Sequence, residues 1–160
     1  MCYIDLMQTD QLCVVTWRTR PRSFVSLMTL YESNFIRLSW LALDVQHLPD
    51  RAVSHVAGDC ELHLAVLDRS RYTTTLALTY RFNDAGGFIT EPNLELRVYH
   101  DARLVEALGS IDSRRHRDLV DMRGNGGQRI DERWMRNQML NKWLEYCAER
   151  GHRFAGTRRV

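Results

Sequence analysis

Two stretches of alternating side chains, separated by only three residues, constrain the fold of this chain more than any other feature of its sequence. In residues 72–82, aromatic and aliphatic side chains alternate with Thr, Ala and Arg, and residues 60–68 alternate in the same way. A period of two residues is typical of β-strands. The link between them is Arg69-Ser70-Arg71, whereas a parallel crossover needs about a dozen residues or more. The sequence therefore predicts an antiparallel hairpin.

Further strands are predicted on both sides of this hairpin. Residues 94–100 alternate again, after a turn at residues 83–87 that contains two neighbouring glycines. A short edge strand is predicted at residues 53–57. Residues 103–108 fit either a returning strand or a turn of helix, and the sequence leaves both open.

A long helix is predicted before the strands. From Phe24 to Val45, apolar residues recur at alternating steps of four and three, which places them along one side of a helix. Ser23 is a suitable N-cap, and Pro49 is a suitable stop signal. The apolar stripe is wide, so we expect this helix to pack across a broad apolar surface such as a sheet.

A second helix is predicted after the strands. It runs from Asp131, as its cap, to Arg150, and Gly151 is placed for the C′ position. An Arg- and Gly-rich loop is predicted before it, at residues 109–130. The chain is thus expected to form an α+β domain: an antiparallel sheet of four or five strands, with the N-terminal and C-terminal helices packed on one face.

This domain is expected to occupy residues 23–151, preceded by a poorly ordered extension at residues 1–22 and followed by a basic tail at residues 152–160. A single domain is consistent with the chain length of 160 residues, of which 44% are hydrophobic.

Charge and cysteine content exclude several classes of protein. The formal net charge is only +2, and the sequence pI of about 8.4 lies below the value of about 9 that is typical of nucleic-acid-binding domains, so nucleic acid is an unlikely partner. No apolar stretch approaches the roughly 20 residues of a membrane span. The four cysteines are scattered, without a C-x-x-C pair, which is typical of a reducing compartment. A cytoplasmic protein without membrane contact is expected.

Several segments together resemble a known family. They are Tyr31-Glu32-Ser33-Asn34-Phe35, Ser70-Arg71-Tyr72-Thr73-Thr74, Leu96-Arg97-Val98-Tyr99-His100-Asp101-Ala102, Asp131-Glu132-Arg133, Asn137-Gln138 and Trp143-Leu144-Glu145-Tyr146-Cys147. In this order and spacing they resemble the YqiB-like family of bacterial proteins of unknown function, over residues 24–151. The resemblance implies a cytosolic proteobacterial protein, and it supplies no activity, cofactor or catalytic residue. Trp134 and Arg136 depart from it, because the family more often has His or Gln and an apolar residue there.

His100 and Asp101 are the weak catalytic candidates. A histidine whose pKa is tuned by a neighbouring carboxylate can act as a general base. A hydrogen-bonded structural histidine at a strand end is the simpler interpretation, because neither residue has a nucleophile partner that the sequence reveals. The sequence predicts neither a metal site nor a cofactor.

The candidate ligand-binding residues are Arg69, Arg71, Tyr72, Thr73 and Arg97. Arginine forks with nearby hydroxyls suit a phosphate or carboxylate, although a solvated hairpin turn would show the same residues. The leading hypothesis is a non-enzymatic binding or regulatory module that uses an Arg/Thr/Tyr-rich sheet face to hold a protein or a small anionic ligand.

Two alternatives stay open. One is a small enzyme acting on a phosphorylated or nucleotide metabolite, with His100 and Asp101 as acid and base and the arginines as an anion clamp. The other is a structural homodimer through the Met/Trp face of the last helix, formed by Met135, Met139, Trp143 and Tyr146.

Overall fold

The computed structural model describes residues 22–110 and 126–155. In chain order, the elements in these ranges are α2 (Phe24–Leu41), the 3₁₀-helix η1 (Val45–His47), β1 (Arg51–Ser54), β2 (Glu61–Arg69), β3 (Thr73–Asp84), β4 (Gly87–Tyr99), β5 (Leu104–Ser110) and α4 (Gly126–Glu149). In these described ranges, neither α-helix is both long enough and apolar enough to cross a membrane.

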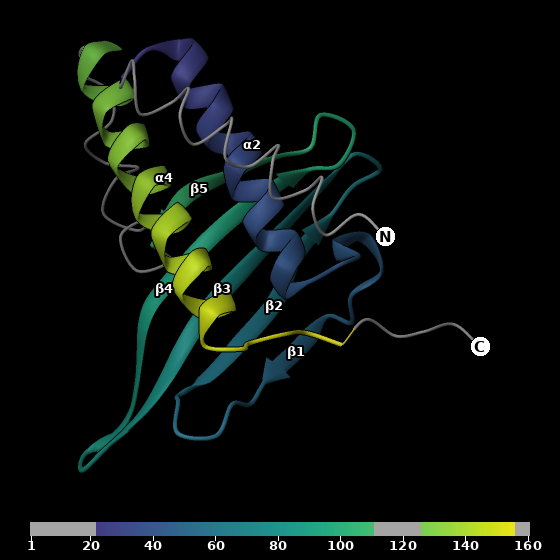
Figure 1. Ribbon diagram of the computed structural model, residues 1–160, viewed down its shortest axis with the longest axis vertical. Coiled ribbons are helices and arrows are strands. Elements are labelled where there is room, and N and C mark those ends of the chain that lie inside the picture. The colour runs from purple at the N-terminus through teal and green to yellow at the C-terminus, as the bar shows by residue number, and fades with distance from the viewer. Residues whose placement is uncertain (1–21, 111–125, 156–160) are drawn as a thin grey trace.

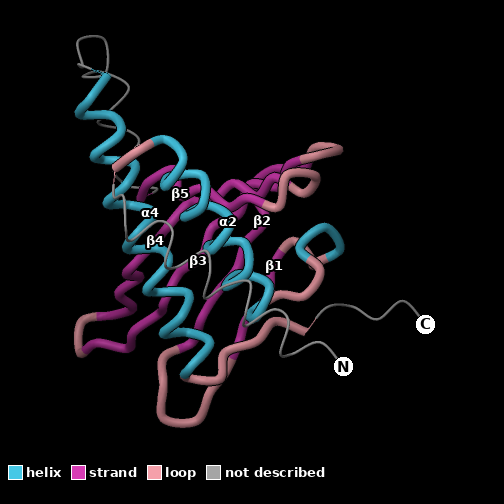
Figure 2. Tube along the Cα trace, turned by 45° about the horizontal axis from the view of Figure 1, so that its top comes forward, coloured by secondary structure: helices cyan, strands magenta, loops and turns pink. Residues whose placement is uncertain are grey.

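The five strands form one antiparallel sheet in the order β1-β2-β3-β4-β5, so every strand pairs with its neighbours along the chain. The hairpin β2–β3 is confirmed, with Leu64 opposite Leu78 in its register. Both helices lie on the same face of the sheet (Figure 1) and side by side (Figure 2). The predicted α+β fold is confirmed. We call the other face of the sheet the open face, because no described helix covers it.

The covered face is almost entirely aliphatic. Strand residues two apart point to the same face, so the alternation in the sequence becomes a layer of buried leucines. The central strands contribute Leu62, Leu64, Leu76, Leu78, Leu94, Leu96 and Val98. The last strand contributes Val105 and Ala107, which are buried on the same side, and this alternation shows that residues 104–110 form a strand rather than a helical turn.

The strands are longer or shifted relative to their predicted bounds. β4 begins at Gly87, seven residues before the predicted start, and the hairpin closes through Ala85 and Gly86 because Asp84 pairs with Gly87. The first half of β4 carries Pro92, which cannot donate a ladder hydrogen bond and interrupts the alternation in the sequence. β1 lies at Arg51–Ser54 instead of residues 53–57.

The predicted N-cap of the first helix is confirmed, because the Ser23 side chain accepts a hydrogen bond from the Ser26 amide at 3.1 Å. The predicted stripe is displaced, however. Phe24 is exposed, and the buried side is centred on Leu27, Leu30 and Asn34. Leu27 and Leu30, rather than Phe24, therefore define the inner side at the start of α2.

The last helix begins earlier than the sequence predicted. α4 starts at Gly126, so Asp131 lies inside the helix, where its carboxylate is 3.6 Å from the Arg22 guanidinium, and is not the cap. The predicted loop at residues 109–130 is therefore shortened at both ends, and its middle lies outside the described residues. The predicted extension at residues 1–22 lies outside them as well, apart from Arg22.

A buried polar network joins both helices to the edge strand β5. The Asn137 side-chain oxygen accepts hydrogen bonds from the Ala107 amide at 2.8 Å and from Asn34 at 3.2 Å. Asn34 also donates to the Val105 carbonyl and accepts from Asn141. Buried amides need such partners, so this network fixes how α2 and α4 sit on the sheet.

The domain extends beyond its predicted end at residue 151. His152 and Phe154 are buried, and the Phe154 amide donates to the Leu41 carbonyl at 2.7 Å. The segment after α4 crosses back beneath the end of α2 toward β1 (Figure 1). His152 and Phe154 therefore belong to the core, whereas the sequence analysis assigned them to a basic tail.

Candidate functional site

Arg69, predicted as part of an anion clamp, makes hydrogen bonds within the protein. Its guanidinium donates hydrogen bonds to the carbonyl oxygens of Gln46 and Leu48, and it lies 3.9 Å from the Asp50 carboxylate. A planar guanidinium can satisfy two acceptors at once. In this structure Arg69 thus holds the η1 segment against the end of β2.

The other predicted ligand-binding residues do not converge on one cleft. Arg71 and Tyr72 are exposed in the β2–β3 turn, where the Arg71 guanidinium carbon lies 5.1 Å from the Tyr72 ring centroid. Thr73 Oγ1 donates to Ser70 Oγ at 3.2 Å in the same turn. Arg97 is paired with Thr75 on the open face, one residue out of phase with the buried Val98.

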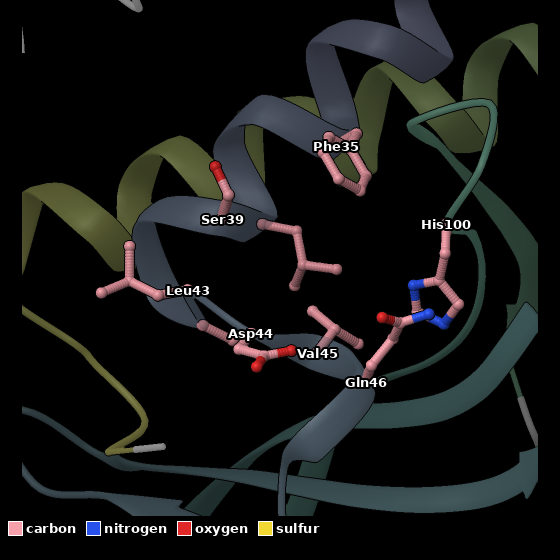
Figure 3. Close-up of a pocket in the computed structure, with 9 residues that line it drawn as sticks. Phe35, Ser39, Leu43, Asp44, Val45, Gln46 and His100 are labelled. Carbon is pink, nitrogen blue, oxygen red and sulfur yellow. The ribbon is translucent and has the colours of Figure 1, made fainter. Parts of the chain in front are cut away.

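His100 lies just past β4, on the same side of the sheet as Val98, and therefore on the side opposite to Arg97. It borders a cavity of about 180 Å³ between the end of α2 and η1. Figure 3 shows its ring projecting toward that segment. The residues that line the cavity are Phe35, Leu38, Ser39, Ala42, Leu43, Asp44, Val45, Gln46 and His100. Of the predicted arginines, Arg69 lies near enough for its charge to act on this histidine, whereas Arg97 lies on the opposite face of the sheet.

The His100 ring is held through one nitrogen. Nε2 lies 2.8 Å from Thr74 Oγ1, and Nδ1 has no hydrogen-bond partner among the described residues. Burial lowers the pKa of His100 below its usual value, and the Arg69 charge acts in the same direction, against the opposing carboxylates of Asp101 and Asp44. The imidazole is therefore neutral at pH 7 and keeps one free nitrogen.

A second depression lies on the open face, where the β3–β4 ladder is interrupted. Thr79 pairs with Asn93, but Arg81 pairs with Thr90, so the register shifts between them. The resulting hollow has a volume of about 210 Å³. We call it the bulge hollow. Its lining residues are His63, Thr79, Arg81, Thr90 and Asn93, all on strands. Bulges often lie beside functional sites because they re-aim side chains.

The polar groups of the bulge hollow are already ordered. Thr79 Oγ1 donates to the Asn93 side-chain oxygen at 2.8 Å, which leaves the Asn93 amide hydrogens directed away from that bond. His63 Nε2 lies 2.9 Å from the Glu61 carboxylate, and this hydrogen bond lowers the pKa of Glu61. His55 Nδ1 lies 3.2 Å from the same carboxylate. Polar groups held in this way are preorganised for a ligand.

The sequence did not single out His152, which is the most completely buried histidine of the described residues, at 0% exposure. Gly151 is the C′ residue, with φ of +94°, as the sequence predicted. The His152 amide then donates to the Cys147 carbonyl and the Gly151 amide to the Ala148 carbonyl, which is the Schellman arrangement. This helix end turns the His152 ring into the core, 5.5 Å from the Tyr80 ring.

Both ring nitrogens of His152 are hydrogen-bonded. Nδ1 lies 3.1 Å from Ser54 Oγ, and Nε2 lies 3.3 Å from an Asp59 carboxylate oxygen. Because the Arg153 amide donates to Ser54 Oγ at 2.9 Å, the Ser54 hydroxyl hydrogen is available for Nδ1, and Nε2–H donates to Asp59. The Arg150 guanidinium contacts the same carboxylate at 3.0 Å. Burial raises the pKa of Asp59, but the hydrogen bonds from Arg150, the Cys60 amide and His152 outweigh it and leave the pKa below its usual value.

Ser54, His152 and Asp59 are the residue types of a hydrolytic triad, but the burial of Ser54 and His152 assigns them a structural role. Ser54 is 4% exposed, so a substrate carbonyl has no path to its oxygen.

The nearby Cys147 thiol is also enclosed, and burial raises its pKa to about 11, which leaves it protonated and unreactive at pH 7. Among the described residues, no group of three or more metal-ligating side chains is placed to hold an ion.

Comparison with known proteins identifies the family. The family model described as "Protein of unknown function (DUF1249)" matches residues 37–153. The chain belongs to this family. The match includes His100, all five residues of the bulge hollow, and His152 with its partners Ser54 and Asp59.

Curated relatives agree with that assignment. "Uncharacterized protein YqiB" of Escherichia coli strain K12 is 30% identical over 128 residues, which is 80% of this chain and 90% of the relative. The protein of the same description from Escherichia coli O157:H7 matches to the same extent. The predicted resemblance to the YqiB-like family is thereby confirmed. No solved structure matches the chain significantly.

Proposed function

We propose that this protein is a non-enzymatic binding module that holds a small anionic ligand on the open face of its sheet. The observation that carries the proposal is the bulge hollow: about 210 Å³, lined by five polar side chains from three neighbouring strands. Sites on strands are held more rigidly than sites on loops. The aliphatic layer on the other face supports these strands directly.

The lining of the hollow suits a carboxylate or phosphate. Arg81 is exposed and carries a planar, permanently charged fork, whose charge also acts on the Glu61 carboxylate opposite it on β2. The Asn93 amide and the Thr90 hydroxyl can donate beside it, because Thr79 already satisfies the Asn93 oxygen. The rest of the face continues the polar surface, with Arg97 and Tyr99 further along β4 and Tyr99 donating to Glu106 at 3.1 Å.

Nuclear magnetic resonance titration tests the proposal, with inorganic phosphate and succinate as the two probes. We expect amide shifts that saturate for Thr79, Thr90 and Asn93, and an affinity that falls at least tenfold in Arg81→Ala. Arg71→Ala is the matched control, because Arg71 is also an exposed arginine but lies in the distant β2–β3 turn. Unchanged spectra with both probes, or equal losses in the two variants, would contradict the proposal.

The cavity beside His100 favours a second candidate function, the small enzyme with His100 as general base. A neutral imidazole with a free Nδ1 next to a cavity has the protonation state that this role needs. Asp101 would tune this base through its charge. Turnover of p-nitrophenyl phosphate that disappears in His100→Gln and persists in His47→Gln would support this function. Turnover that persists in His100→Gln would remove it.

A further inference from the structure

The outer side of α4 carries an apolar row that no described element covers. Met135 is 67% exposed and Met139 is 50% exposed, and both lie on the side of the helix opposite to the buried Leu140 and Leu144. Trp143, which the sequence grouped with these methionines, is instead partly buried, with its ring 5.7 Å from that of Tyr80. The exposed row is therefore distinct from the packed side.

Charged residues extend this row in the spacing of a coiled-coil seam. Glu132, Met135, Met139 and Lys142 follow one another at steps of three, four and three, and all four are exposed. We call these four residues the α4 seam. Alternating steps of three and four keep residues on the line along which two helices can pack. A seam of two methionines flanked by opposite charges fits a partner helix with the same pattern in reverse.

We propose that two copies of this chain pair through the α4 seam, with the two helices antiparallel about a two-fold axis. In an antiparallel pair, the residue numbers of facing positions have a constant sum. If Met135 faces Met139 of the second copy, then Glu132 faces Lys142 of the second copy. A two-fold axis forms each contact twice, so the dimer has four methionines in its centre and an ion pair at each end.

Charge selects this register over the next one. A shift of one heptad would place Met135 opposite Tyr146, and it would then place Glu132 opposite Glu149, which is also exposed. Two such pairs of like charges would oppose that register. The seam is short, so the expected dimer is weak and forms in a concentration-dependent manner. This inference is independent of the bulge hollow, because the hollow lies on the other face of the sheet.

Sedimentation equilibrium of the full chain tests the pairing. The wild-type chain should dimerise with increasing concentration. In Glu132→Lys or Lys142→Glu, both opposite-charge pairs become like-charge pairs, which should raise the dissociation constant roughly tenfold. The double variant E132K/K142E should restore the wild-type dissociation constant, because it recreates the two pairs with the charges exchanged.

Glu149→Lys is the control on the same side of the helix, because Glu149 lies beyond the contacting layers in the proposed register. It should leave the dissociation constant unchanged. Thermal unfolding of every variant shows whether the fold is retained, which is expected because all the altered side chains are exposed. A wild-type chain that stays monomeric at its highest soluble concentration overturns the proposal. So does a double variant that dimerises no better than the single ones.

Discussion

Two histidines of this protein, His152 and His100, differ in how far the fold satisfies their ring nitrogens. His152 is wholly enclosed, and both of its nitrogens are bonded, one to Ser54 and the other to Asp59. His100 is half-buried, bonded only through Nε2 to Thr74, and borders a cavity. The ring of His152 has no nitrogen left to hydrogen-bond a ligand, whereas the ring of His100 keeps Nδ1 for one.

The difference teaches that burial alone does not identify a functional histidine. What matters is whether the hydrogen-bonding capacity of the ring is exhausted by the fold. His152 connects β1, the loop before β2 and the end of α4, and its loss would affect all three. The His100 side chain is hydrogen-bonded to one threonine and otherwise borders a cavity. Replacing this side chain should therefore leave the fold nearly intact. Three experiments test this contrast.

The largest effect is expected for His152→Ala. The change removes a buried ring and leaves the Ser54 hydroxyl and the Asp59 carboxylate without their partner, which should cost about 3 kcal/mol of unfolding free energy. Urea denaturation at pH 7 measures this loss. His152→Phe keeps the ring volume without the nitrogens, so the difference between the two variants separates packing from hydrogen bonding. A midpoint unchanged in both would refute the structural role.

An intermediate effect is expected for Arg69→Ala. Arg69 donates to two carbonyls of the segment that forms the wall of the His100 cavity. Losing both hydrogen bonds should cost about 1–2 kcal/mol, measured by the same denaturation experiment. Arg71→Ala provides the comparison, since Arg71 is two residues away and its guanidinium lies over the Tyr72 ring, its one interaction partner among the described residues. This change should alter stability by less than about 0.5 kcal/mol. Equal losses in the two variants would show that the hydrogen bonds of Arg69 to the η1 segment do not stabilise the fold.

The smallest effect is expected for His100 and depends on pH. Its pKa in the folded chain lies below the unfolded value of 6.5, so the unfolded state binds more protons as the pH falls through this range. Stability is therefore lost as the pH decreases from 6.5 toward the folded-state pKa, and it is recovered above 6.5. His100→Gln should flatten this part of the stability profile while changing the stability at pH 7 by less than about 1 kcal/mol. A slope as steep as that of the wild type would show that His100 is not its source.

The sheet could be predicted from the sequence because its evidence is local. Period-two alternation and a three-residue link sufficed for the hairpin β2–β3. Ser23 marked a helix start through its side-chain oxygen, and Gly151 marked a helix end through its positive φ. The first half of β4 could not be predicted, because Pro92 interrupts its pattern. The start of α4 was missed because Gly126 and Gly127 suggest a loop, whereas the chain enters the helix there.

The candidate sites depended on contacts that sequence spacing does not encode. His152 meets Ser54 across 98 positions of the chain, and no local signal marks such a pair. The bulge hollow arises from a shift in register between Thr79 and Arg81, which alternation alone cannot reveal. The arginines singled out by residue type proved to lie in different places: Arg97 is on the open face, Arg69 contacts the η1 segment, and Arg71 lies in the β2–β3 turn.

The pinning of Phe154 to the end of α2 has a consequence for folding during synthesis. Leu41 is made early, but its carbonyl receives the Phe154 amide, and the Phe154 ring fills the same core as Leu38 and Leu62. The sheet can form strand by strand as the chain emerges, because each strand pairs with the one before it. The aliphatic layer stays open at one corner until residue 154 has been added. A nascent chain shorter than this would leave that corner of the apolar core exposed to water.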